Sequence, residues 1–220
     1  MDKWKNSVVI VIGANSGVGL AILKKLAQSG LKVVGFDIKL DAIEKLKVEL
    51  KNAKIYSWAC DITKDDITEA SFQWVEKNVG SIDILINCAG QHKSINTLSQ
   101  QNSMAEIISH IDVNYIAVIR CIRLAFKYME ARDTHGYIVN VNCNSSTNIA
   151  VKATLDAMRA ELNQLRNRKV RITNLSPGDE FDNLSFDNPN IKPAHIGDII
   201  FYLLTIPYEV SVTNMQLKAT

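Results

Sequence analysis

The chain has 220 residues, 47% of which are hydrophobic, and a formal net charge of +2 at pH 7. A chain of this size and composition can form one compact domain with a substantial buried core, so we assign residues 1–220 to a single domain. Basic and acidic residues are nearly balanced and mixed along the sequence, which argues against nucleic acid as a partner.

Apolar runs and cysteine spacing indicate the compartment. The first apolar run, Val8 to Ile12, is too short for the hydrophobic part of a signal peptide or for a membrane span. The cysteines form no CxxC motif or Cys/His cluster, which predicts neither a disulfide framework nor a metal site. They are Cys60, Cys88, Cys121 and Cys143. We expect free thiols and a cytoplasmic protein.

Short apolar runs and longer helical patterns alternate along the chain. The runs are continuous, which is typical of strands buried on both faces of a parallel sheet. They begin at Val8, Lys32, Lys54, Ile82, Gly136 and Val170, and a last short strand is expected within residues 210–217. This order predicts an α/β fold in which a doubly wound parallel sheet lies between two layers of helices. Ligands of such sheets bind beyond the carboxyl ends of the strands.

The first predicted strand is followed by "GANSGVG", which places Gly13, Gly17 and Gly19 in a turn that opens a helix. Glycines let backbone amides approach a pyrophosphate closely, and a helix amino terminus favours its negative charge. We include Asn15, Ser16 and Val18 among the expected cofactor contacts. A tight turn that binds no ligand is the alternative.

The second predicted strand ends in Asp37, 18 residues after Gly19. A carboxylate at this place can accept hydrogen bonds from an adenosine ribose, and it repels a 2'-phosphate. NAD is therefore favoured over NADP. Lys39 offsets part of that repulsion, which keeps NADP open as the less favoured cofactor.

Several motifs occur in an order and at distances that together carry a resemblance. They are the GxxxGxG glycine spacing, "CDIT" at 60–63, "NCAG" at 87–90, "DVN" at 112–114 and "SPG" at 176–178. The chain resembles the short-chain dehydrogenase/reductase family over nearly its whole length. Its opening "MDKW", the "VVGFD" strand and the tail "IGDIIFYLLTIPYEVSV" are most similar to insect farnesol-dehydrogenase-like members.

The resemblance implies a Rossmann-type fold and roles for particular residues. Asp61 is expected near the adenine and Asn114 beside a proton-relay water. The other implied cofactor contacts are Asn87, Ala89, Gly90, Lys152, Pro177 and Gly178. The structural alternatives are a turn acid at the end of a strand for Asp61 and a satisfied amide inside a long helix for Asn114.

The catalytic pattern of the family is broken in this chain. Members use a tyrosine as proton donor or acceptor, a lysine four residues later and a serine that orients the substrate oxygen. Here Lys152 matches the lysine, Asn148 stands at the tyrosine position and Cys143 at the serine position, and the sequence contains no YxxxK. The loop between Cys143 and Asn148 is short, so Ser145 or Ser146 could occupy the serine's place.

Two further places bear on activity. His92 follows "NCAG" and is either a proton donor near the substrate or a solvated loop histidine, while Cys143 is either a nucleophile or an inert thiol. After "SPG" the stretch "DEFDNLSFDNPNIKPAH" is short and acidic where family members carry a longer lid, and Asp182 falls near the place of a carboxamide contact. We expect a shallower and wetter pocket.

Three hypotheses remain open from the sequence. The chain is an NAD-dependent oxidoreductase of a small apolar alcohol or aldehyde with weak or altered activity, or a catalytically inactive relative that acts as a ligand-binding or interaction protein. A third possibility is a variant of an active enzyme with a shortened loop. The family resemblance also implies a homodimer, formed by the helices around residues 104–130 and 152–166.

Overall fold

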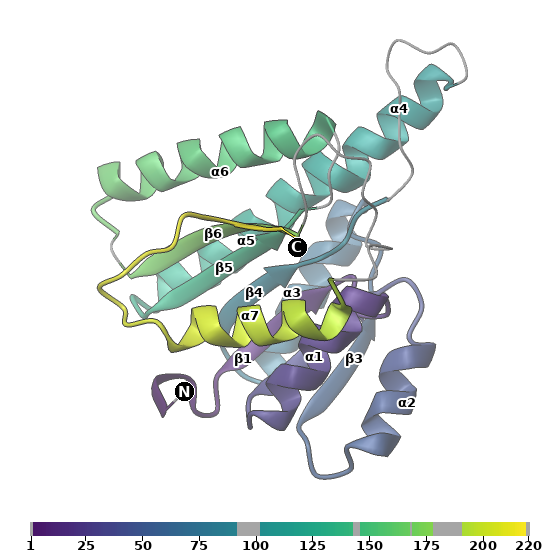
Figure 1. Cartoon of the computed structure of the whole chain (residues 1–220), viewed down its shortest axis with the longest axis vertical. Helices are drawn as coiled ribbons and strands as arrows, with labels where there is room; N and C mark the ends of the chain where they lie inside the picture. The colour runs from purple at the N-terminus through teal and green to yellow at the C-terminus, as the bar shows by residue number, and fades with distance from the viewer. Residues whose placement is uncertain (1, 92–101, 143–145, 168, 178–190, 219–220) are drawn as a thin grey trace.

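The computed structural model describes residues 2–91, 102–142, 146–167, 169–177 and 191–218. Its sheet has seven parallel strands in the order β3-β2-β1-β4-β5-β6-β7, as predicted for a doubly wound fold (Figure 1). The strands are β1 (Val8–Ile12), β2 (Lys32–Asp37), β3 (Ile55–Ala59), β4 (Ile82–Asn87), β5 (Gly136–Val141), β6 (Val170–Pro177) and β7 (Asn214–Leu217).

Helices cover both faces of the sheet. They are α1 (Gly17–Gln28), α2 (Asp41–Glu49), α3 (Asp65–Asn78), α4 (Met104–Ile111), α5 (Ala117–Ala131), α6 (Ser146–Gln164) and α7 (Pro193–Thr205). A short 3-10 helix, η1 (Asp2–Trp4), precedes β1, and a π-helix, η2 (Asp112–Ile116), joins α4 to α5. None of the helices in the described ranges is long and apolar enough to cross a membrane.

Two hydrophobic cores lie on opposite faces of the sheet. One contains the apolar residues of α1, α2 and α7, and the other those of α3, α5 and α6. β1 shows why its apolar run is continuous: Val9 and Val11 point into the first core, while Val8, Ile10 and Ile12 point into the second. Both faces of the strand are therefore buried.

The order in which strands are added to the sheet reverses between β1 and β4. β2 and β3 extend the sheet on one side of β1, and β4 to β7 extend it on the other. At this switch point the carboxyl ends of β1 and β4 lie side by side, because Ile12 pairs with Asn87. Crevices for ligands form at such points in open α/β sheets.

Candidate functional site

The turn after β1 is held by two glycines that the backbone requires. Gly13 has φ +76°, and a Cβ there would lie 2.8 Å from the amide nitrogen of Ala89. A Cβ on Gly19 would lie 2.1 Å from the carbonyl oxygen of Gly13. Neither position tolerates a larger residue, because both approach backbone atoms.

Gly17 differs, since no contact within the described residues requires a glycine there. Its Cβ would meet only Cγ of Pro193, at the ordinary distance of 3.8 Å. Glycine is unfavourable in a helix, yet Gly17 is the first residue of α1. Ser16 caps this helix: its Oγ accepts from the Gly19 amide at 3.2 Å and donates to the Gly13 carbonyl at 2.7 Å. An open backbone at a capped helix amino terminus fits the close approach of a phosphate.

Asp37 is fixed at the end of β2 by two backbone amides. Its Oδ2 accepts from the Asn15 amide at 3.0 Å, and its Oδ1 accepts from the Lys39 amide at 3.3 Å. The Asn15 side chain accepts in turn from the Ala42 amide at 2.8 Å, which joins the glycine turn to the start of α2. The carboxylate therefore has a defined position beside the turn.

Asp61 follows β3 and accepts hydrogen bonds within its own turn, and its expected place near the adenine stays a prediction. Its Oδ1 accepts from the hydroxyl of Thr63 at 2.7 Å and from the Thr63 amide at 3.0 Å. The Thr63 hydroxyl makes the largest contribution to lowering the pKa of Asp61 below its usual value. The ionised carboxylate is thus held in the wall of a cleft.

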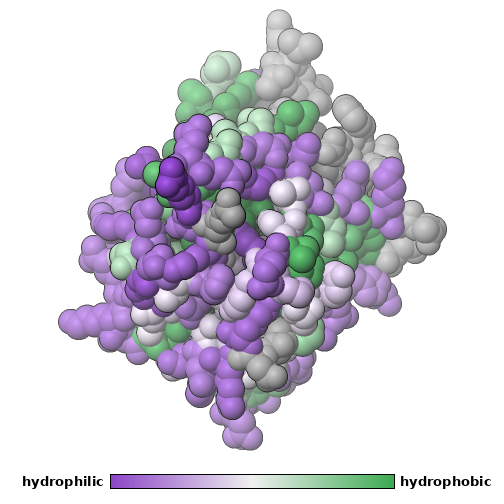
Figure 2. Space-filling view, turned by 90° about the vertical axis from the view of Figure 1, so that its left-hand side faces the viewer, coloured by the Kyte–Doolittle hydropathy of each residue, from purple (hydrophilic) through white to green (hydrophobic). Residues whose placement is uncertain are grey.

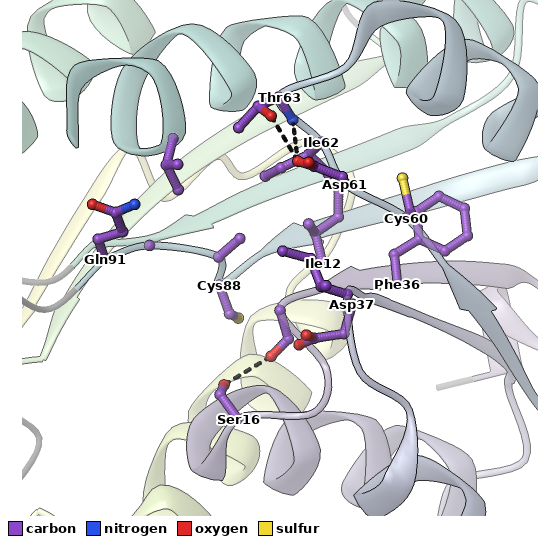
Figure 3. A pocket seen from close by; sticks show the side chains of 15 residues that line it. Ile12, Ser16, Phe36, Asp37, Cys60, Asp61, Ile62, Thr63, Cys88 and Gln91 are labelled. Atoms are coloured by element: carbon purple, nitrogen blue, oxygen red, sulfur yellow. Dashed lines mark hydrogen bonds between the residues drawn. The ribbon is translucent and has the colours of Figure 1, made fainter. Parts of the chain in front are cut away.

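We call this cleft, which has a volume of about 410 Å³, the carboxyl-end cleft. It is lined by Ile12, Gly13, Ser16, Phe36, Asp37, Ile38, Cys60, Asp61, Ile62, Thr63, Cys88, Ala89, Gly90, Gln91 and Val113. Figure 3 shows Ser16 and Asp37 on one side of it, Asp61 and Thr63 on another, and Gln91 at one end.

The cleft brings together six of the residues predicted to contact a cofactor, namely Gly13, Ser16, Asp37, Asp61, Ala89 and Gly90. Asn15, Gly17, Val18 and Gly19 belong to the adjoining turn and helix start. Sequence reasoning missed the apolar lining, including Ile38, which is 71% exposed. Apart from Val113 in η2, these apolar residues lie at or just after strand ends, so the sheet topology was the signal that could have found them.

Asn87 does not line the cleft, because its side chain lies within the sheet. It is 1% exposed, and its Nδ2 donates to Oδ1 of Asn140 at 2.9 Å. The pattern continues as Asn140 donates to Asn142, Asn142 to Asn174, and Asn174 to Oγ of Ser176. We call Asn87, Asn140, Asn142 and Asn174 the asparagine row. No described residue gives Oδ1 of Asn87 a hydrogen bond.

Asn114 lies in η2 and is 8% exposed. Its Oδ1 accepts from the Gln91 amide at 2.7 Å, and its Nδ2 donates to the Gln91 carbonyl at 3.1 Å. These bonds tie the π-helix to the segment that follows β4. Asn114 is therefore a satisfied amide, as the structural alternative predicted, and it borders the cleft through Gln91; its role beside a relay water stays a prediction.

His110 is a residue that sequence reasoning missed. It is 2% exposed, and its Nε2 lies 3.1 Å from Nδ2 of Asn114 and 3.3 Å from Oγ1 of Thr147. The Gln91 contacts fix the Asn114 amide with its nitrogen toward His110, so Nε2 must accept and the ring proton sits on Nδ1. Burial lowers the pKa of His110. The four-residue spacing to Asn114 was the available signal.

The counterparts of the family's tyrosine and lysine lie on α6. Asn148 has a buried Nδ2 that finds no hydrogen-bond partner within the part of the chain that the structure describes, and Lys152, half-buried, follows four residues later. Pro177 is buried at the end of β6. Of the other predicted site residues, Cys143, Ser145, Gly178, His92 and Asp182 lie outside the described residues. No group of His, Cys, Asp or Glu within the described ranges could hold a metal ion.

The model of the short chain dehydrogenase family matches residues 7–179. The chain therefore belongs to the short-chain dehydrogenase family.

Among its relatives, the farnesol dehydrogenase of Aedes aegypti is 29% identical over 242 residues, covering 99% of this chain and 98% of that protein. The human dehydrogenase/reductase SDR family member 11 is 27% identical, covering 100% of this chain and 96% of that protein. The resemblance to farnesol-dehydrogenase-like members is thus confirmed. Because the first alignment spans 242 positions and this chain has 220 residues, at least 22 positions are unmatched here.

Solved structures show the same fold. A metagenomic short-chain oxidoreductase solved in complex with NADP superposes with a TM-score of 0.80 at 23% identity, covering 98% of both chains. A hydroxysteroid dehydrogenase from Escherichia coli superposes with a TM-score of 0.79 at 21% identity, covering 98% of this chain and 95% of that one.

Proposed function

We propose that this chain binds a nicotinamide dinucleotide, NAD in preference to NADP, and is a weak oxidoreductase of a small apolar alcohol or aldehyde. The observation that carries this proposal is the convergence of the glycine turn, Asp37 and Asp61 on one cleft at the switch point of the sheet. Family membership and the NADP complex of a structural neighbour support the binding of a nicotinamide dinucleotide, whereas the preference for NAD rests on Asp37.

The residues of the cleft suit each part of the cofactor. The capped amino terminus of α1 and the open backbone of Gly17 would receive the pyrophosphate. Asp37 would accept hydrogen bonds from the adenosine ribose, and Ile38 and Asp61 would flank the adenine. The carboxylate of Asp37 disfavours a second negative charge on that ribose, which is the reason for preferring NAD.

The bound cofactor would supply or accept a hydride, so a group of the protein must donate the proton to the substrate oxygen or accept it. Asn148 stands where the family has its proton-transferring tyrosine, and an amide does not exchange a proton near neutral pH. Losing a positioned acid or base typically slows a reaction ~10²- to 10⁴-fold. The unpartnered Nδ2 of Asn148 can still donate to a substrate oxygen and orient it.

The substrate class rests on the relatives. The farnesol dehydrogenase at 29% identity favours an isoprenoid alcohol or its aldehyde. The second candidate function is a catalytically inactive relative that binds the dinucleotide and acts as a sensing or interaction protein, and the absence of YxxxK favours it.

The test is titration with NADH and with NADPH by calorimetry, followed by assays of farnesol oxidation and farnesal reduction. We expect NADH to bind more tightly than NADPH, and the wild type to turn over slowly or not at all. Asn148→Tyr should raise turnover by at least about tenfold, because it restores the acid four residues before Lys152.

Asn163→Tyr makes the same substitution on an exposed turn of α6 and should leave turnover unchanged. Binding of NADH without turnover in either protein would favour the inactive candidate. Binding of neither nucleotide would refute both candidates. Equal turnover by the wild type and Asn148→Tyr would show that another group moves the proton.

A further inference from the structure

A second cleft, of about 850 Å³, opens at the amino ends of β5 and β6. We call it the amino-end cleft. Its walls come from the second half of α6, the start of β6 and the segment from Tyr208 to Thr213. Figure 2 looks onto this end of the sheet, where most of the surface is hydrophilic. The proposed function makes no use of it, since the cofactor residues lie at the opposite ends of the strands.

Arg171, the second residue of β6, lines this cleft and is only 5% exposed. Its Nη1 donates to the carbonyl oxygens of Val210 at 2.8 Å and Pro207 at 2.9 Å. Its Nε and Nη2 are buried and have no hydrogen-bond partner among the described residues. A guanidinium presents these two N–H groups side by side, in the geometry that receives both oxygens of a carboxylate. The two nitrogens that suit an anion, Nε and Nη2, are thus the two without a partner among the described residues.

The charges near Arg171 leave a positive excess. Arg159 is already paired with Asp156. Lys3 lies close enough that burial and the charge of Arg171 lower its pKa. Among the described residues that line the cleft, Asp156 is taken by Arg159, so the carboxylate left to offset Arg171 and Lys3 is that of Glu209. One negative charge would restore neutrality, whereas a dianion such as phosphate would exceed it.

Apolar surface surrounds the charged group. The guanidinium carbon lies 4.4 Å from the ring centroid of Tyr137 and 5.6 Å from that of Tyr208. The exposed ring of His135 stacks on Tyr208 at 3.8 Å, so this pair covers the guanidinium from solvent. Leu162 and Ile172 add aliphatic surface. A ligand that reaches Arg171 by displacing His135 and Tyr208 would meet aromatic and aliphatic walls.

We propose that the amino-end cleft binds a small organic monocarboxylate with an apolar body. Its two oxygens accept hydrogen bonds from Nε and Nη2 of Arg171, and its body replaces the cover formed by Tyr208 and His135. The bound carboxylate supplies the negative charge that Glu209 alone does not provide against the two cations, Arg171 and Lys3.

The test is titration of the full chain with sodium benzoate, hexanoate, acetate and phosphate. Binding is followed by calorimetry and by the NMR resonance of the Arg171 Nε–H group. We expect benzoate and hexanoate to bind more tightly than acetate or phosphate and to shift that resonance. Arg171→Lys should weaken benzoate binding by about tenfold or more, since an ammonium cannot make the paired contact. No benzoate binding, or tighter binding of phosphate, would overturn the proposal.

Arg171 also anchors the segment before β7, so its variants could fail to fold. Ser211 is exposed on the wall of the cleft and provides a second test. Ser211→Glu adds a negative charge there and should weaken benzoate binding by about tenfold, whereas the equally long, neutral Ser211→Gln should not. Equal binding by these two variants would contradict the proposal, as would displacement of benzoate by saturating NADH.

Discussion

Glycine occupies the three positions of the first turn for different physical reasons. Gly13 and Gly19 are required because added Cβ atoms would collide with backbone atoms of the protein itself. Gly17 meets no such obstacle among the described residues. Two glycines of the motif are therefore needed for the fold and the third for the proposed binding site. Single substitutions can separate the effect on stability from the effect on binding.

We predict that Gly17→Ala weakens NADH binding by about tenfold or more while its free energy of unfolding stays within about 1 kcal/mol of the wild type. The added methyl would obstruct the approach of a pyrophosphate without disturbing the helix. Gly19→Ala is the matched comparison and should cost at least about 2 kcal/mol, because its Cβ overlaps the Gly13 carbonyl. Urea unfolding and NADH titration measure both. Unchanged binding by Gly17→Ala would remove the main support for the pyrophosphate position.

Sequence patterns predicted the strands but not the environment of α4. Continuous apolar runs located β1 to β6. The burial on both faces that these runs predict is wrong for β3, an edge strand whose residues after Ile55 are partly or fully exposed. In α4 the apolar Met104 and Ile108 are 66% and 60% exposed, while the polar His110 is the buried residue. A prediction from the hydrophobic pattern would place the apolar side of α4 toward the core and His110 toward solvent, which is the opposite of the structure. The site beside Asn114 therefore required the three-dimensional structure.

The last strand shows a second departure. It was expected within residues 210–217 but begins at Asn214. Val210 is 50% exposed and lies in the segment whose carbonyl groups bind Arg171, so it does not pair with β6. The helical segment from 107 to 122 divides its apolar residues between core and surface: Val118 and Ile122 are buried, whereas Ile111 is 41% exposed.

The burial of His110 predicts a pH dependence of stability. Its pKa in the folded protein lies below the ordinary value of 6.5, so the unfolded chain binds a proton more readily than the folded one. The free energy of unfolding should therefore fall as the pH drops below about 6.5 toward the folded pKa. Urea unfolding at a series of pH values would show this.

His110→Gln should flatten that dependence, because glutamine can still accept from Asn114 but does not titrate. His195→Gln, at an exposed histidine of α7, should leave it unchanged. If His110→Gln kept the full dependence on pH, other groups would be responsible.

At the scale of the whole molecule, exposed apolar side chains lie on the helices that are expected to form the homodimer interface. Met104, Ile108 and Ile111 follow helical spacing on α4, and Ile116 and Ile149 are 43% and 62% exposed on η2 and α6. α4 projects from the body of the molecule (Figure 1). Contiguous exposed apolar surface commonly marks a protein interface.

We predict a homodimer through this surface. Ile108→Glu should shift the protein toward the monomer, since a charge in an apolar interface costs several kcal/mol. Val48→Glu places the same charge on α2, at a residue that is 68% exposed, and should leave the dimer intact. Light scattering coupled to size-exclusion chromatography distinguishes the states. A monomeric wild type would refute the prediction.

The asparagine row has a direction, because every amide in it donates from Asn87 toward Ser176. Turning a single amide would bring two donors or two acceptors together at its neighbours, so the row can reverse only as a unit. It spans β4, β5 and β6 and ends in the unpartnered Oδ1 of Asn87. The side-chain amides on these three strands therefore have two possible orientations, which all of them adopt together. A donor that reached Oδ1 of Asn87 would fix the orientation of every amide in the row.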